Sequence, residues 1–309
     1  MKMLEAINKF SQWKYLKVRP NTIFGYDVHL RHFCIFLRDP DIEHITLDQI
    51  VEYLHWNARM GFKASSLQKK SLAIKEFLDF FLKQDCKVIN PSLVPIARKE
   101  NTMPRILTDE DFGKLVNAIP NNRAYYNLRN LAIIDLLHDS GARIGELMSL
   151  NVSDLDFKNN EATVRTEKSR EDCPFRKIFW YRKETTYSIK NWLIKRLELL
   201  TKTNVEEKDA LFVSVNGGAC HSGAVGRRMD IEAAGEALRK YSRLAGLKYV
   251  VNAHSFRHRV GQELAKRGAN NSLISEVLGH ARLDSSKIYT RLNGLTGGIF
   301  RKIMVKQPF

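Results

Sequence analysis

The stretch HSFRHRVGQELAKRGANNSLISEVLGHARLDSSKIYT, residues 254 to 290, carries the strongest signal in the chain. It opens with His254 and Arg257, which are three residues apart and therefore share one face of a helix. It closes with a Leu-Gly-His motif and with Tyr289, nine residues after His280. Taken alone, Tyr289 could be a core aromatic or a nucleophile, and His280 could cap a helix. The rest of the chain has to decide between these interpretations.

The chain is strongly basic. It has 309 residues, of which 44% are hydrophobic, and a formal net charge of +16. This is more residues than a domain with a single hydrophobic core usually contains, so the length predicts two domains. A positive excess of this size predicts a polyanionic partner, with nucleic acid ahead of an acidic membrane surface. Because no apolar stretch could span a bilayer and no signal peptide is evident, we expect a cytoplasmic protein with no membrane partner.

The cysteine and histidine spacings predict neither disulfides nor a metal site. The four cysteines are Cys34, Cys86, Cys173 and Cys220. They lie far apart and form no CxxC motif, so we expect reduced thiols. His29 and His32 could share a helix face, but no further ligand lies near them in the sequence. We therefore expect no metal and no cofactor.

The first hundred residues are expected to be helical. Apolar residues recur at helical spacing between residues 22 and 37. Thr46 and Gln49 form a capping box that starts a helix ending at Gly61. Residues 65 to 84 place their apolar side chains on one side of a further helix. These segments predict a compact helical domain.

Three lysines of the 65–84 helix lie largely away from its apolar side. They are Lys69, Lys70 and Lys75. For any single lysine a solvated surface is the simpler interpretation. Several such basic faces in one helical domain predict a surface that contacts DNA.

Prolines mark the boundary between the two expected domains. Pro91, Pro95 and Pro104 disfavour a continuous helix, and the stretch around them has no helical period. The predicted boundaries are 1–96 for the helical domain, 97–107 for the linker and 108–309 for the second domain, with a C-terminal tail from about 294. The linker predicts that the two domains fold around separate cores.

The second domain is expected to be mainly helical with one small sheet. Acidic residues after Thr108 favour a helix start, and Gly141 is expected to end an apolar helix, with another beginning at about Arg143. Residues 154–180 alternate β-forming side chains around an Asn-Asn turn at 159–160. This pattern predicts a three-stranded antiparallel sheet, so the fold class is mainly α with a small antiparallel β-sheet.

Four short pieces of the second domain together fit one reaction. They are SGARIGEL (140–147), TEK (166–168), HSFRH (254–258) and LGHARLDSSKIY (278–289). Moving a phosphodiester bond without metal or nucleotide needs two arginines on the non-bridging oxygens and imidazoles that donate further hydrogen bonds. It also needs a cation to protonate the leaving 5′-oxygen and a hydroxyl to attack. The sequence supplies Arg143 and Arg257, His254 and His280, Lys168 and Tyr289.

Together these motifs resemble the signature of the tyrosine recombinases, the phage-integrase, Cre and Xer family. In that family a His-x-x-Arg helix is followed by Leu-Gly-His and, about nine residues later, by a nucleophilic tyrosine. SGARIGEL is similar to the family's first arginine motif, Gly-x-Arg-x-x-Glu-Leu. The resemblance covers essentially the whole chain. It implies an N-terminal helical, SAM-like core-binding bundle followed by a catalytic domain.

The resemblance implies how the phosphate is held. Arg143 and Arg257 would hold the scissile phosphate between them. His254 would donate to a non-bridging oxygen and assist proton transfer from the tyrosine. His280 would contact the same phosphate.

The resemblance also implies the reacting groups. Tyr289 would form a 3′-phosphotyrosine, and Lys168 would be the general acid for the leaving 5′-hydroxyl. Glu146 would orient the site without reacting itself. The hairpin departs from the family's usual Gly-Lys-Gly-x-Lys-x-Arg pattern, so Lys177 in the returning strand stays open as the alternative acid.

The implied function is site-specific recombination of double-stranded DNA through a Holliday junction. The family works as a homotetramer on DNA without metal or ATP, and a monomer in solution is compatible with this. In a prokaryotic host the protein would associate with the nucleoid. The alternatives are a type IB topoisomerase, which SSKIY partly resembles, and a catalytically silent, architectural DNA-binding protein. Residues 297–309 are expected to dock on a neighbouring protomer, with a frayed terminus as the alternative.

Overall fold

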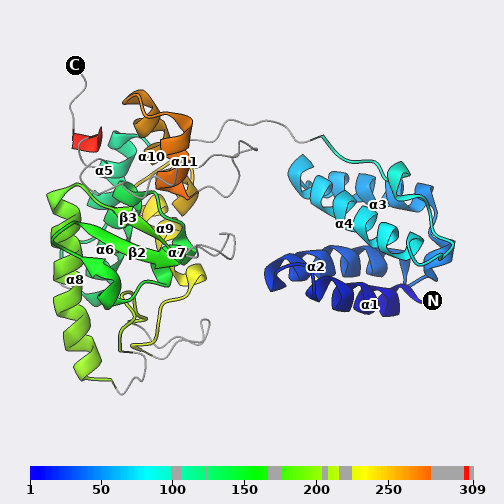
Figure 1. Cartoon of the computed structure of the whole chain (residues 1–309), viewed down its shortest axis with the longest axis horizontal. Coiled ribbons are helices and arrows are strands. Elements are labelled where there is room, and N and C mark those ends of the chain that lie inside the picture. The colour runs from blue at the N-terminus through cyan, green and yellow to red at the C-terminus, as the bar shows by residue number, and fades with distance from the viewer. Residues whose placement is uncertain are drawn as a thin grey trace. The chain divides into compact units, whose positions relative to one another are not determined.

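The chain forms two compact units, Met1–Met103 and Pro104–Phe309 (Figure 1). The computed structural model describes residues 1–98, 106–122, 124–165, 175–203, 208–215, 225–279 and 303–305. Each unit has a hydrophobic core of its own.

The N-terminal unit is a bundle of four helices, drawn in blue to cyan in Figure 1. The helices are α1 (Met3–Tyr15), α2 (Pro20–Leu37), α3 (Leu47–Arg59) and α4 (Ala64–Leu82), with short 3-10 turns at Ile42–His44 and Pro91–Leu93. The predicted capping box is confirmed, because the Thr46 side chain accepts from the Gln49 backbone N–H and the Gln49 side chain accepts from that of Thr46. Phe10, Phe33 and Phe77 are fully buried between the helices, which makes the core rich in aromatic rings.

The C-terminal unit surrounds a small sheet with helices (Figure 1). Its elements are α5 (Asp109–Asn117), α6 (Tyr125–Ser140), α7 (Ile144–Met148), a 3-10 turn (Val152–Asp154), β1 (Leu155–Asp156), β2 (Glu161–Arg165), β3 (Phe175–Phe179), α8 (Lys183–Thr201), α9 (Ile231–Leu244), α10 (Ala253–Lys266) and α11 (Asn271–Leu278). The sheet is antiparallel with the order β1-β2-β3, which confirms the predicted fold class. Thr108 caps α5 and Gly141 ends α6, both as expected.

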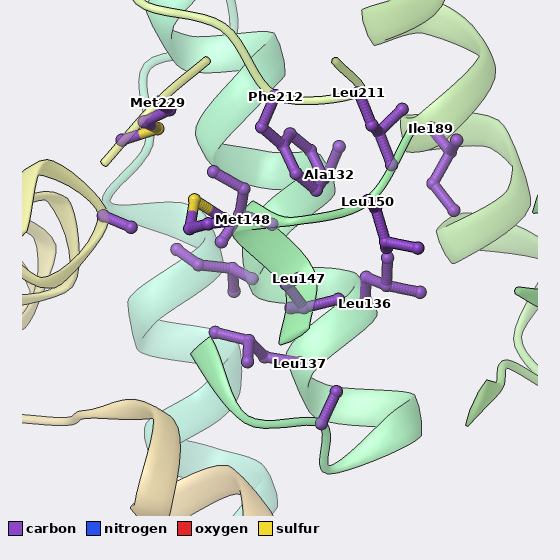
Figure 2. Close-up of a cluster of buried hydrophobic side chains, with 14 of the residues drawn as sticks. Ala132, Leu136, Leu137, Leu147, Met148, Leu150, Ile189, Leu211, Phe212 and Met229 are labelled. Carbon is purple, nitrogen blue, oxygen red and sulfur yellow. The ribbon is translucent and has the colours of Figure 1, made fainter. Parts of the chain in front are cut away.

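The central helix of this unit is α6, which is buried along nearly its whole length. Figure 2 shows Leu136 and Leu137 of α6 among Leu147 and Met148 of α7 and Phe212. All five side chains are at most 3% exposed. Burying a side chain of this kind contributes roughly 1.5–3 kcal/mol. The turn between α6 and α7, which carries Arg143, therefore rests on a closely packed scaffold.

Cys34 and Cys86 are free thiols, and Cys173 and Cys220 lie outside the described residues. None of the described helices is long and apolar enough to cross a membrane. In the same part of the chain, no cluster of His, Cys, Asp and Glu side chains is arranged to hold a metal ion. His32 instead lies 3.1 Å from the Lys70 ammonium, through its Nδ1.

Candidate active site

The first arginine motif turns sharply at Gly141. This residue ends α6 with φ +58°, a conformation that favours glycine. A Cβ atom here would lie 3.0 Å from Val260 Cβ and 3.1 Å from Leu278 Cδ2. The missing side chain therefore allows the turn to pack directly against α10 and α11, and Arg143 follows two residues later at the N-terminus of α7.

Glu146 orients Arg143. Its carboxylate accepts from the Arg143 backbone N–H at 2.8 Å and from Arg143 Nη1, also at 2.8 Å. Glu146 is only 1% exposed, and a buried carboxylate is tolerated when it is paired in this way. Burial disfavours its charged form, but the neighbouring arginines Arg176 and Arg143 outweigh that effect and lower its pKa. Glu146 thus caps α7 and holds the guanidinium group with one side chain.

The second arginine motif opens α10. Asn252 caps the helix by accepting from the Ser255 backbone N–H at 3.1 Å. His254 follows in the first turn and is exposed, whereas Arg257, one turn further, is buried. Arg257 Nη1 donates to the Gly141 carbonyl oxygen at 3.1 Å. Two motifs that are more than a hundred residues apart in the sequence therefore meet directly.

Three arginines converge on the C-terminal end of α11. Arg143 Nη2 donates to the carbonyl oxygen of Gly279 at 2.6 Å, and Arg176 Nη1 donates to that of Val277 at 2.7 Å. Arg257 Nη2 donates to the carbonyl oxygen of Leu278. The last carbonyls of a helix have no partner within it and carry partial negative charge, so they attract guanidinium groups. We call Arg143, Arg176 and Arg257 the arginine cluster.

Among the described residues, the three positive charges of the arginine cluster face one carboxylate, that of Glu146. Burial, and then the charges of Arg143 and Arg176, lower the pKa of Arg257, while the Glu146 carboxylate opposes them. Guanidinium groups bind phosphate through paired hydrogen bonds, and an anion would relieve their mutual repulsion. The cluster therefore has the chemistry of a site for a phosphate group.

Arg176 is the residue that the sequence prediction missed. It lies on β3 opposite Val164, while the neighbouring pair is Ala162 and Ile178. These three partners are buried, so Arg176 occupies an inward position of the sheet. The sequence did contain a signal for Arg176 as a candidate functional residue, because it is an arginine at an inward position of a predicted strand.

Lys177, the alternative general acid, takes the other face of the sheet. Neighbouring residues of a strand point to opposite faces, so its side chain points away from that of Arg176. Its Nζ donates to Glu161 Oε1 at 2.5 Å. Lys168, His280 and Tyr289 lie outside the described residues.

The described part of the tail lies against this chain's own helices. Arg267 Nη1 donates to the carbonyl oxygens of Ile303 and Met304, at 3.1 and 2.7 Å. Met304 is buried in a cluster that includes Leu264 and Leu278. Residues 303–305 thus contact the chain itself, and docking of residues 297–309 on a neighbouring protomer stays a prediction.

The predicted DNA-facing lysines of α4 differ in their placement. Lys69 is exposed and Lys75 is partly exposed, but Lys70 is only 4% exposed. Its Nζ donates to the hydroxyl oxygen of Tyr53 at 3.1 Å and lies 4.8 Å from the centre of the Phe62 ring. Lys70 therefore belongs to the interior of the bundle and not to the surface on which we had placed it. The physical reason is its helical register, four residues before the buried Ile74.

Comparison with known proteins points to one family. Residues 105–294 match the phage integrase family, and residues 7–85 match the phage integrase N-terminal SAM-like domain. The chain is 26% identical over 289 residues to the tyrosine recombinase XerC of Mannheimia succiniciproducens, and the match covers 91% of each chain. It is 25% identical over 277 residues to the tyrosine recombinase XerD of Oceanobacillus iheyensis, covering 88% of each.

A solved structure shows the same fold. The crystal structure of a lambda integrase tetramer bound to a Holliday junction matches with a TM-score of 0.67 and 15% identity. The match covers 100% of this chain and 79% of that one. Because the first family model alone spans more than half of the sequence, the chain belongs to the phage integrase family, the tyrosine-type site-specific DNA recombinases.

Proposed function

We propose that Arg143 and Arg257 hold the scissile phosphate of a DNA strand. The observation that carries this proposal is the convergence of their guanidinium groups on consecutive carbonyls, those of Gly279 and Leu278. Both groups are oriented by fixed partners, since Glu146 binds Arg143 and the Gly141 carbonyl binds Arg257. Oriented donors of this kind stabilise charge as it develops on the non-bridging oxygens.

The reaction we propose uses Tyr289 as the nucleophile. Its hydroxyl oxygen attacks phosphorus, the bond from phosphorus to the 5′-oxygen breaks, and a 3′-phosphotyrosine forms. Lys168 protonates the leaving 5′-oxygen, while His254 and His280 donate to the phosphate and His254 assists removal of the tyrosine proton. A 5′-hydroxyl then attacks the phosphotyrosine and restores the phosphodiester. Since one phosphodiester replaces another, the reaction conserves bond energy and requires no ATP.

The partner we propose is double-stranded DNA, bound by a homotetramer that exchanges strands through a Holliday junction. The net charge of +16 supports contacts with the phosphate backbone, and Lys69 and Lys75 are the α4 lysines open to solvent. Binding should weaken steeply with salt, because each neutralised phosphate releases counterions. The enzyme would act on DNA in the cytoplasm, at the nucleoid of a prokaryotic host.

The test is the covalent adduct itself. A duplex selected from a random-sequence pool by binding to the Tyr289→Phe protein would be nicked near its centre, so that the cleaved end cannot be resealed. The wild-type protein is expected to become covalently attached to this duplex, and Tyr289→Phe is not. Tyr187→Phe, which alters a tyrosine that is 69% exposed, is the matched control and should react like the wild type.

Other outcomes separate the alternatives. Tight binding by the wild-type protein with no adduct would indicate the architectural DNA-binding protein. Adduct formation together with relaxation of supercoiled DNA of any sequence would indicate a type IB topoisomerase. An adduct with Tyr289→Phe would show that another residue is the nucleophile.

A further inference from the structure

Arg176 connects its own strand, β3, to two other elements of the C-terminal unit. It stands on β3, and its side chain is 11% exposed. Its Nη2 donates to Glu146 Oε2 at 2.6 Å, and its Nε donates to Glu146 Oε1 at 3.3 Å. Its third nitrogen, Nη1, donates to the carbonyl oxygen of Val277 at 2.7 Å. One planar group therefore links the sheet, α7 and the end of α11.

The Glu146 carboxylate serves Arg143 and Arg176 together. Oε1 accepts from Arg143 Nη1 and from Arg176 Nε, while Oε2 accepts from the Arg143 backbone and from Arg176 Nη2. Two guanidinium groups thus hold this carboxylate from two sides. Removing Arg176 would leave only the two hydrogen bonds from Arg143 on the carboxylate, so its terminal torsion, which is broad in such side chains, would be less restricted. The Arg143 guanidinium would then have a less firmly fixed partner.

The end of α11 also rests on Arg176. Gly279 ends the helix with φ +63°, and a Cβ atom there would lie 2.7 Å from both Cδ and Nε of Arg176. Because a side chain at this position would overlap Arg176, the backbone can approach it only with glycine. The next residue is His280, the first of the segment that leads to Tyr289.

We infer that Arg176 is a positioning residue for strand cleavage. Through Glu146 it sets the orientation of Arg143, and through the Val277 carbonyl it sets where α11 ends and the segment with His280 and Tyr289 begins. It thereby fixes the position of Arg143 relative to the end of α11, where the segment with His280 and Tyr289 begins. This inference rests on the proposed function, since it assigns a task to Arg176 within the same site.

The experiment compares single-turnover rates of adduct formation on the selected, nicked duplex. Arg176→Ala is expected to slow the reaction about 10- to 100-fold, as losing a group that orients a reacting residue does. The Kd for the duplex should change by less than about threefold, because Arg143 and Arg257 still provide the positive charge. Arg176→Lys keeps one charge but cannot reach both Glu146 and Val277, so an intermediate rate is expected.

Arg196 provides the matched control. It is a buried arginine that also donates to backbone carbonyls, those of Ala210 and Lys208, but it lies outside the arginine cluster. Arg196→Ala should lower the melting temperature and leave the reaction rate of the folded protein unchanged. If Arg176→Ala behaves in the same way, Arg176 is structural only and the inference is wrong.

A double-mutant cycle tests the route through Glu146. In a Glu146→Gln background, the further loss caused by Arg176→Ala should be clearly smaller than in the wild type, because both changes interrupt the connection through Glu146 and only the contact with Val277 remains. Fully additive losses would show that Arg176 acts independently of Glu146, as a direct phosphate contact would, and would overturn the inference. If Arg176→Ala does not fold, Arg176→Lys completes the same cycle. A wild-type protein without any adduct contradicts the proposed function itself, before any variant is compared.

Discussion

Arg182 and Arg257 are two largely buried arginines of the same unit in opposite electrostatic surroundings. Arg182 lies between two carboxylates, with Nη2 2.8 Å from Asp135 Oδ1 and Nε 2.6 Å from Asp139 Oδ1. Arg257 donates to two backbone carbonyls, and its neighbours include the charges of Arg143 and Arg176. Two carboxylates balance the charge of Arg182, whereas Arg257 has two arginines and the Glu146 carboxylate as its charged neighbours.

The pKa shifts of the two arginines follow this difference. Burial works against the charged form of Arg182, yet the carboxylates of Asp139 and Asp135 outweigh it and raise its pKa. For Arg257 burial and its arginine neighbours act in the same direction and lower the pKa. We therefore expect Arg182 to stabilise the fold and Arg257 to bind an external anion, as proposed for the scissile phosphate.

Arg182→Met should give the largest change in stability. It leaves Asp135 and Asp139 buried without their counterion, and breaking such a pair costs about 3–5 kcal/mol. Urea denaturation should show this loss, while the folded fraction keeps its rate of adduct formation. Arg239→Met, at a side chain that is 43% exposed, is the control and should change stability by less than about 0.5 kcal/mol. An unchanged stability of Arg182→Met would remove the distinction between the two arginines.

Arg257→Met should have the opposite profile. Losing one donor to the developing charge is expected to slow adduct formation about 10²- to 10³-fold, or about 2.7–4 kcal/mol of transition-state stabilisation. The free energy of unfolding should stay the same or increase, because a cation among like charges is removed. Rapid-quench kinetics and urea denaturation measure the two effects. Strong destabilisation with an unchanged rate would mean that Arg257 is structural, like Arg182.

Lys70 extends the comparison to the N-terminal unit. Burial lowers its pKa, and its ammonium is held by Tyr53, His32 and the Phe62 ring. Lys70→Met should therefore raise the free energy of unfolding by roughly 1 kcal/mol, since hydrophobic replacement of a buried charge is often stabilising. Lys69→Met, one residue earlier on the surface, should leave it nearly unchanged. A loss of stability in Lys70→Met would show that the ammonium contributes more than its burial takes away.

The same unit should lose stability in acid. Burial, and then the charge of Lys70, lower the pKa of both His29 and His32 from 6.5, so the folded state binds fewer protons than the unfolded state below that pH. Unfolding should therefore become easier as the pH falls from 7 through the lowered pKa values of these histidines. Urea midpoints measured between pH 5 and 7 provide the check. A His29→Gln, His32→Gln double variant should flatten this dependence, and an unchanged slope would contradict the assignment.

The smallest expected effect is binding of inorganic phosphate to the protein without DNA. At a phosphate concentration equal to the Kd, the gain in stability is only about 0.4 kcal/mol. Differential scanning fluorimetry with increasing phosphate at constant ionic strength should detect it as a small rise in melting temperature. Arg257→Met should not respond, whereas Arg239→Met should respond like the wild type. An equal rise in all three proteins would indicate general salt stabilisation.

Local features of the fold were predictable because few residues determine them. The Thr46–Gln49 capping box, the end of α6 at Gly141 and the three-stranded sheet were all expected, and the structure contains them. Each depends on backbone dihedrals, helix caps or side-chain alternation over a handful of positions. The placement of His254 and Arg257 on one helix was likewise a matter of spacing.

What the sequence determined by itself was the kind of chemistry, through arginines and histidines at motif spacings within single helices and turns. Only the tertiary structure decided which charges are balanced. Glu146 meets Arg176 across 30 residues, Asp139 meets Arg182 across 43, and Arg143 meets the Gly279 carbonyl across 136. Burial and charge balance depend on which distant side chains pack together, and that information is not local to any motif. For this reason Arg176 was overlooked, whereas Lys70 was placed on the surface because its helical register with the buried Ile74 was missed.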